Sequence, residues 1–238
     1  MTGFYHIRHI VRKCLAILSL SIILFSCSHG YAEDSRFALD TVVTLRLEKE
    51  AYIDKAFSDL GDAEKKISAF IDDSEIHRIN SNAGIAPVAV SEDVFSLIEL
   101  ALELEKETDG FFSPLLGPLT MLWNIGREDQ RVPGVEEIER ALALIDSDYC
   151  ILDRDRRTVF LARSGMALDL GGIGKGYVSD AIVESLRKEG ASSGLINLGG
   201  NVYAMGRKEG GGKWKIGITD PGSARSECFD TIEAEDEA

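Results

Sequence analysis

Residues 168–177, with the sequence Leu-Asp-Leu-Gly-Gly-Ile-Gly-Lys-Gly-Tyr, join an apolar run to four glycines and a lysine. An amphipathic segment that extends to Lys188 follows directly. This pattern predicts a strand, a tight glycine turn and the start of a helix. Glycine allows positive φ angles and a close backbone approach to a ligand, and the N–H groups at a helix start attract anions. A phosphate site and a plain structural turn both fit the stretch.

The two common phosphate-binding motifs do not match this stretch. A Walker loop requires glycine where Asp169 stands, and Ser or Thr where Gly176 follows Lys175. The dinucleotide fingerprint requires Gly-x-Gly-x-x-Gly, whereas the spacing from Gly172 is Gly-x-Gly-x-Gly. Neither family of nucleotide-binding folds is therefore predicted from this stretch.

Composition and charge limit the classes of partner. The chain has 238 residues, of which 45% are hydrophobic and 28% charged, as in ordinary globular proteins. The net charge of −14 argues against nucleic acid or an anionic membrane surface as the main partner. An anionic ligand must then be held by local groups, such as backbone N–H groups, a single lysine or a metal ion.

The first 27 residues have the pattern of an export signal. Arg8, Arg12 and Lys13 precede an apolar stretch at 14–25 that is too short to span a bilayer. It ends in Leu-Phe-Ser-Cys at 24–27, which resembles a bacterial lipobox with Cys27 as the acylated residue. The alternative is an ordinary signal peptide cleaved near Ala32. Both predict export, and the lipobox predicts a lipoprotein anchored in the membrane on its periplasmic side.

Residues 28–36 are predicted to be a linker, and the length of the chain allows one large domain or two small ones. Two cysteines, Cys150 and Cys228, lie beyond the linker. They either pair in the oxidising compartment or remain single, since nothing in the sequence places them together. No cluster of histidines and cysteines has the spacing of metal ligands.

Hydrophobic periodicity predicts that the chain forms both helices and strands. Residues 74–80 are a polar loop or a short helix. The apolar stretch 111–123 contains two prolines and a glycine, so we expect an irregular segment that either walls a ligand site or crosses the core. Helices are predicted at 52–70, 91–110, 135–145 and 177–188, with Ser91 as an N-cap. Strands are predicted at 37–47, 149–152, 158–161, 193–205 (broken at 197–201), 214–218 and 229–234.

Six blocks of sequence, taken together and in order, resemble the flavin transferase family known as ApbE, also called thiamine biosynthesis lipoproteins. The resemblance extends from Phe37 to Ala238. The blocks are Leu39-Asp40-Thr41; 73–76 with Ile79-Asn80; 108–110 with 117–119 and Leu122-Trp123; 169–177; 197–201; and 214–221.

The resemblance implies a single domain over residues 37–238 with an α+β fold, in which mixed or antiparallel sheets are flanked by helices. This domain would bind FAD as a substrate together with a divalent metal, usually Mg²⁺. Members of this family transfer FMN from FAD to a Thr or Ser hydroxyl of a target protein and release AMP. The implied partners are exported flavin-accepting subunits of redox complexes. Some relatives instead hydrolyse FAD to FMN and AMP, and a third hypothesis is an FAD-binding lipoprotein without catalysis.

The resemblance also implies individual roles. Gly172 would offer its backbone carbonyl to the metal, and Asn80 lies in a block near the site. Leu39 stands where the family usually has methionine, and Ser113 where it usually has aspartate. The implied cofactor-binding residues are Leu39, Phe70, Phe111, Phe112, Ser113, Asp169 and Lys175.

One departure concerns the catalytic residues. The family has a His-x-x-Asp-Pro-x-Thr-Gly block and a later aspartate with a nearby Ser or Thr, and nothing after Asp220 matches either. We therefore expect this chain to be a fragment without the C-terminal part of the domain. Its catalytic residues stay unknown, and a lone carbonyl at Gly172 would not hold Mg²⁺.

Overall fold

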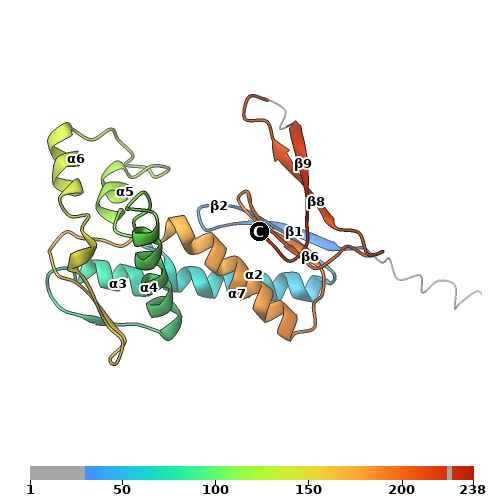
Figure 1. Cartoon of the computed structure of the whole chain (residues 1–238), viewed down its shortest axis with the longest axis horizontal. Coiled ribbons are helices and arrows are strands. Elements are labelled where there is room, and N and C mark those ends of the chain that lie inside the picture. Colours follow the sequence, from blue (N-terminus) through green and yellow to red (C-terminus); the bar gives the residue numbers. More distant parts are fainter. Residues whose placement is uncertain (1–29, 224–226) are drawn as a thin grey trace, which may run out of the picture. The chain divides into compact units, whose positions relative to one another are not determined.

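A computed structural model describes residues 30–223 and 227–238 of the chain (Figure 1). The predicted export signal and its lipobox cysteine, Cys27, lie outside the described residues. Residues 32–238 group together as one unit with a shared hydrophobic core. No helix among the described residues has the length and apolar character needed to cross a membrane.

The largest sheet has four antiparallel strands. These are β1 (Ala32–Ala38), β2 (Thr41–Leu47), β6 (Gly194–Leu198) and β7 (Asn201–Met205), in the order β1-β2-β6-β7. Strand β2 has the alternation that the sequence predicts, because Val43, Leu45 and Leu47 are fully buried while Thr44 and Arg46 are not. The sheet thus presents one apolar face to the core.

The prediction of one continuous strand over 37–47 is wrong. The chain turns back at Leu39 and Asp40, whose φ angles are 51° and 54°, and Ala38 pairs with Thr41. Such a two-residue hairpin turn needs positive φ and normally selects glycine or asparagine, so the sequence pattern conceals it. The predicted linker at 28–36 is likewise too long, because residues 32–36 belong to β1.

Two helices pack side by side against this sheet, α2 (Glu50–Ile67) and α7 (Gly171–Lys188) (Figure 1). Their apolar residues recur at helical spacing and form one buried face on each helix. The buried members are Tyr52, Ile53, Ala56, Phe57, Leu60 and Ile67 on α2, and Val178, Ile182, Val183 and Leu186 on α7.

A second sheet has the order β3-β5-β4 and consists of β3 (Val88–Ala89), β5 (Thr158–Leu161) and β4 (Cys150–Asp153). The predicted hairpin of β4 and β5 is confirmed, and its strands are antiparallel. Residues 74–80, left open between loop and helix, form α3 (Glu75–Ser81). Ser91 caps α4 (Glu92–Glu107) as predicted, since its hydroxyl accepts from the Val94 amide at 3.4 Å.

The proline-containing stretch 111–123 is irregular only in its first half. Helix α5 (Gly117–Trp123) follows, and Pro118 is accommodated because the first turn of a helix needs no N–H donor there. Helix α6 (Val135–Leu142) and the 3₁₀ turn η1 (Ser147–Tyr149) then lead to β4. The remaining pair, β8 (Trp214–Thr219) and β9 (Cys228–Ala234), forms a two-stranded antiparallel sheet. The α+β class with antiparallel sheets is confirmed.

The two domain cysteines are not paired, so the second of the two alternatives holds. Cys150 is buried on β4, and burial raises the pKa of its thiol to about 12, while Cys228 is exposed on β9. The thiolate is the reactive form of cysteine. We therefore expect iodoacetamide at pH 8 to label Cys228 in the native protein and to leave Cys150 unmodified. Peptide mass spectrometry reads out each cysteine separately, and equal labelling of both would contradict the buried position.

Candidate functional site

Two adjoining cavities open where the β1–β2 turn, the C-terminal end of α2 and the N-terminal end of α7 meet. Their shared wall consists of Leu39, Asp40, Phe70, Asp169, Gly171 and Lys175. The larger cavity has a volume of about 590 Å³, which lies within the usual range for small-molecule sites. It continues along α5 and the turn after it through Leu116, Leu119, Thr120, Trp123, Asn124, Ile125 and Arg127.

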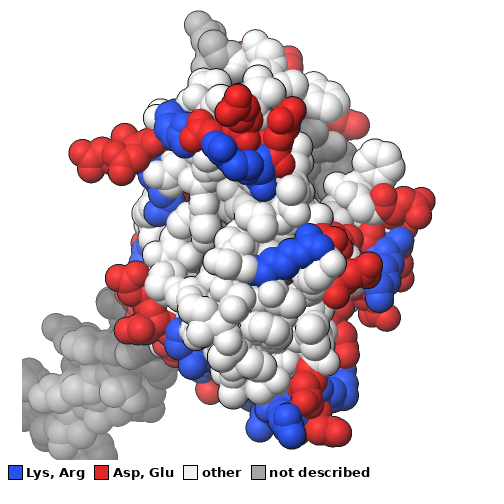
Figure 2. Space-filling view, turned by 90° about the vertical axis from the view of Figure 1, so that its left-hand side faces the viewer, with Lys and Arg blue, Asp and Glu red and all other residues white. Residues whose placement is uncertain are grey.

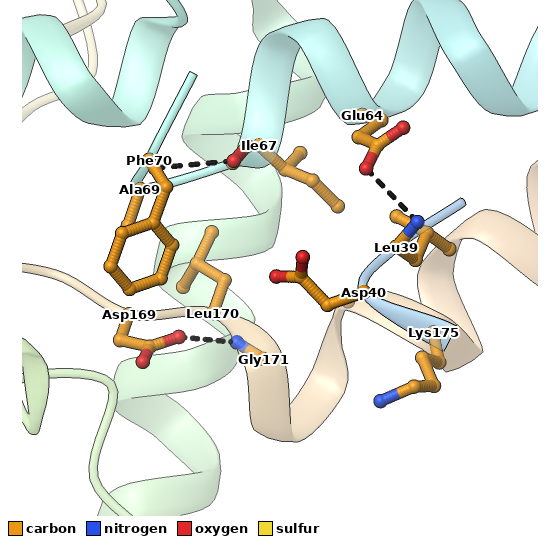
Figure 3. A pocket seen from close by; sticks show the side chains of 12 residues that line it. Leu39, Asp40, Glu64, Ile67, Ala69, Phe70, Asp169, Leu170, Gly171 and Lys175 are labelled. Atoms are coloured by element: carbon orange, nitrogen blue, oxygen red, sulfur yellow. Dashed lines mark hydrogen bonds between the residues drawn. The ribbon is translucent and has the colours of Figure 1, made fainter. Parts of the chain in front are cut away.

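The β1–β2 turn is held over the cavities by helix α2. The Leu39 amide donates to Glu64 Oε1 at 2.9 Å, and Figure 3 shows this contact above Asp40 and Lys175. A leucine at positive φ is strained, because its Cβ crowds the backbone in that region. The hydrogen bond to Glu64 therefore compensates part of the cost of placing Leu39 and Asp40 on the cavity wall.

The segment before α7 belongs to no strand, so the predicted strand over 168–170 is wrong. Its backbone is satisfied in another way. Asn80 on α3 accepts from the Leu168 amide at 2.7 Å and donates to the Leu168 carbonyl at 2.9 Å, and the Asp169 amide donates to the Pro114 carbonyl at 2.8 Å. Leu168 is fully buried, so Asn80 takes the place of a neighbouring strand.

Helix α7 begins at Gly171, and the carboxylate of Asp169 lies next to its N-terminal end. Asp169 Oδ1 accepts from the Gly171 amide at 2.8 Å, as Figure 3 shows, and this carboxylate lies at the positive end of the helix dipole. The Ile173 and Gly174 amides donate to the Leu170 carbonyl. A phosphate at this helix end would therefore compete with Asp169, and a simple anion site formed by the helix terminus does not fit.

The glycines of 171–176 do not form the predicted turn, because all of them lie inside α7 and none has a positive φ. Two of them, Gly172 and Gly174, are closely packed. A Cβ atom on Gly172 would lie 2.7 Å from the ring of Phe112, and one on Gly174 would lie 3.2 Å from Ile67. The small residues thus let α7 approach α2 and the 111–116 segment closely.

Arg127 is a cavity residue that no sequence pattern indicated. It follows α5 in a tight turn, where Asn124 has a φ of 48° and accepts from the Arg127 amide at 3.2 Å. Its guanidinium lies over the ring of Phe70, 3.7 Å from the ring centroid, and donates to Asp40 Oδ2 at 3.3 Å. The only available signal was the neighbouring Leu122-Trp123 block, which does not include Arg127.

Four of the seven predicted cofactor-binding residues line the cavities, and three do not. Leu39, Phe70, Asp169 and Lys175 line the cavities. Phe112 packs against Gly172 instead, and its amide donates to Thr108 Oγ1. Ser113 is buried and accepts from the Leu115 amide at 3.2 Å, so it organises the loop, whereas Phe111 is 97% exposed. Phe111, Phe112 and Ser113 do not appear on either cavity wall, and the binding role of the other four stays a prediction.

The described residues do not supply a complete metal site. Across residues 30–223 and 227–238, no group of three or more His, Cys, Asp or Glu side chains is arranged to hold a metal ion. The predicted contribution of Gly172 falls in the first turn of α7, where the geometry of a helix directs its carbonyl along the helix axis. Mg²⁺ prefers six oxygen ligands, so the residues described here do not fit it by themselves.

Charge is mixed on the face that Figure 2 shows, where lysines and arginines alternate with acidic residues around a broad uncharged area. On the larger cavity the charged residues are Asp40, Asp169, Lys175 and Arg127, two of each sign. An anionic ligand would therefore be held by individual cations and not by a basic field.

The comparisons with known proteins assign the family. The profile of the ApbE family matches residues 39–238. The chain belongs to the ApbE family. Curated ApbE relatives include a protein named FAD:protein FMN transferase from Treponema pallidum, 37% identical over 187 residues that cover 73% of this chain and 52% of the relative. A Klebsiella pneumoniae protein with the same name is 41% identical over 63% of this chain and 45% of its own length. The chain thus spans about half the length of these relatives.

Solved ApbE structures have the same fold. The ApbE protein of Thermotoga maritima superposes with a TM-score of 0.80 at 31% identity, covering 87% of this chain and 68% of that one. The flavin transferase ApbE of Vibrio cholerae gives a TM-score of 0.76 at 23% identity, covering 87% of this chain and 69% of that one, a likeness that concerns the fold alone.

Proposed function

We propose that this protein is an FAD:protein FMN transferase, which moves FMN from FAD to a Thr or Ser hydroxyl of a target protein and releases AMP. The observation that carries the proposal is the larger cavity. It combines about 590 Å³ of space with an aromatic ring, Phe70, and two cations, Lys175 and Arg127. A dinucleotide with two flat ring systems and a charged diphosphate needs this combination of groups. Membership of the ApbE family supports it.

The proposed reaction is a displacement at the phosphorus of the FMN half. The target hydroxyl oxygen forms the new P–O bond, the bond to the bridging oxygen breaks, AMP leaves with that oxygen, and the hydroxyl proton passes to a base. Phosphoryl transfer depends mainly on positioning and on charge neutralisation of the phosphate oxygens. The described residues contribute the positioning: the cavity wall receives the rings, and Lys175 neutralises phosphate charge.

Mg²⁺ dependence is also part of the proposal. A bound Mg²⁺ would neutralise phosphate oxygens and stabilise the leaving group. The described residues do not form a metal-binding group, so they would not hold this ion by themselves. The same finding favours a second candidate function, a non-catalytic FAD-binding lipoprotein.

We further propose that the protein is exported, acylated at Cys27 and anchored in a bacterial membrane on its periplasmic side. The basic residues and apolar run of 8–25 and the lipobox pattern of 24–27 support this. The partner would be an exported flavin-accepting subunit of a redox complex.

The test is incubation of a version extended to the full length of its ApbE relatives with FAD, Mg²⁺ and a flavin-accepting protein domain, followed by mass spectrometry and chromatography of nucleotides. We expect an FMN adduct on the acceptor and an equal amount of AMP. Release of FMN and AMP without the acceptor would instead identify an FAD pyrophosphatase. FAD binding without any AMP would identify the non-catalytic binder.

Asp169 offers a test of FAD binding at this site. A hydrogen bond that involves a charged group contributes about 1.5–3 kcal/mol, so Asp169→Ala is expected to weaken FAD binding roughly 10- to 150-fold. Asp169→Asn keeps an acceptor for the Gly171 amide and separates the helix-capping role from the charge. The measurement is a fluorescence titration with FAD. A folded Asp169→Ala variant with unchanged affinity would remove Asp169 from the binding site.

A further inference from the structure

We propose that Arg127 binds the diphosphate of the dinucleotide together with Lys175, and that its release from Asp40 uncovers the Phe70 ring for stacking. This inference rests on the proposed function and names a binding residue that neither the sequence blocks nor the family resemblance includes. It is carried by the position of Arg127 between two other cavity residues, Asp40 and Phe70.

The wall of the larger cavity carries balanced charges. Arg127 and Lys175 are the cations on the wall of the larger cavity, and Asp40 and Asp169 are its carboxylates. Within the part of the chain that is described, no ion pair involves Lys175, whereas Arg127 pairs with Asp40. A diphosphate carries two negative charges, and a balanced wall attracts it only if the cations are free of their carboxylates. Arg127 must therefore exchange Asp40 for the ligand.

The exchange of Asp40 for a diphosphate costs Arg127 little free energy. The side chain of Asp40 is 79% exposed and that of Arg127 is 37% exposed, with 3.3 Å between Asp40 Oδ2 and the guanidinium. An exposed ion pair of this kind contributes little to stability, because water solvates both charges after separation. A guanidinium can donate to two phosphate oxygens at once. In the pair with Asp40, Arg127 donates to one carboxylate oxygen, Oδ2.

The guanidinium of Arg127 also covers the ring of Phe70. The Arg127 group lies 3.7 Å from the ring centroid, so it covers the face on which a flavin or adenine ring would stack. Movement of Arg127 toward a diphosphate exposes that face. The backbone of the turn need not move, since Arg127 follows the fixed end of α5 and the Arg131 amide closes the loop on the Trp123 carbonyl at 3.3 Å. One side-chain movement thus provides both a cation and a stacking surface.

The experiment compares FAD, ADP and riboflavin as ligands of wild type, Arg127→Ala and Arg131→Ala. Arg131 is a matched control, because it lies in the same loop and pairs with Glu137 at 2.7 Å but does not line the cavity. We expect Arg127→Ala to weaken FAD and ADP binding about tenfold or more, and to leave riboflavin, which has no phosphate, unchanged or bound more tightly. Arg131→Ala is expected to bind all three ligands like wild type.

Other outcomes separate the hypotheses. An unchanged FAD affinity in Arg127→Ala would overturn the inference, and so would an equal loss for riboflavin, which would mean that Arg127 stacks with the ring. Absence of FAD binding by wild type would instead count against the proposed function. Asp40→Asn removes the competing carboxylate charge and is expected to raise FAD affinity by up to about fivefold. A loss of affinity in this variant would contradict the exchange.

Discussion

Replacing Asn80 with alanine will lower the free energy of unfolding by about 2–6 kcal/mol, because two buried backbone groups lose their partner. Asn80 bonds both the amide and the carbonyl of Leu168, which is fully buried and belongs to no strand. Each unsatisfied buried group costs about 1–3 kcal/mol. Urea denaturation followed by circular dichroism measures the loss.

The same substitution will weaken FAD binding, since Leu168 precedes Asp169 and the start of α7 on the cavity wall. Asn82→Ala is the matched control. Asn82 lies just after the same helix, and its side chain donates to the Arg78 carbonyl at 2.8 Å in a solvent-exposed position. We expect a small effect in the control. If both variants lost the same stability, the bonds between Asn80 and Leu168 would not be the cause.

Replacing Gly117 with alanine will destabilise the protein by about 1–3 kcal/mol, the usual cost of overpacking. A Cβ atom at Gly117 would lie 2.5 Å from the carbonyl oxygen of Ala167 and 2.7 Å from its carbonyl carbon. These are backbone atoms of the segment that leads to Asp169, so they cannot rotate away. Helix α5 must move instead, and with it the cavity residues Leu119 and Trp123. Denaturation and FAD titration measure the two consequences.

Gly176→Ala is the control for this variant. Gly176 lies inside α7, and no heavy atom lies within 4 Å of the position that a Cβ would occupy. Alanine is a better helix former than glycine, so Gly176→Ala is expected to stabilise the protein by about 0.5–1 kcal/mol. Opposite signs for the two Gly→Ala changes are the expected result. Stabilisation by both would mean that α5 does not press on Ala167.

Some elements could be predicted because their causes are local in sequence. The apolar residues Ile53, Phe57 and Leu60 recur at helical spacing, and they are buried on α2 as expected. Ser91 was identifiable as an N-cap from the acidic residues and apolar face that follow it. The β4–β5 hairpin has apolar strands on either side of a charged turn at 154–157. In each case neighbouring residues alone fix the backbone conformation.

Other features were wrong or missing because their causes are distant in sequence. The β1–β2 turn has no glycine, and its strained Leu39 is held by Glu64, 25 residues away. The segment before α7 was predicted to be a strand but belongs to no sheet. Its backbone at Leu168 is hydrogen-bonded by the side chain of Asn80, which lies 88 residues earlier in the chain. Residues at 171–176 resembled a turn because glycine composition does not distinguish a flexible backbone from a closely packed one.

The identity of the chain as a member of the ApbE family, its α+β class, and the inclusion of Asp169 and Lys175 in a candidate site all followed from ordered motifs in the sequence. Tertiary contacts were needed to show that Asp169 caps α7, that the glycines serve packing against Phe112 and Ile67, and that Arg127 covers Phe70. The physical reason is the same for all three. Hydrogen bonds, close packing and ion pairs depend on distances in space, and local sequence patterns carry no information about residues that approach from elsewhere in the chain.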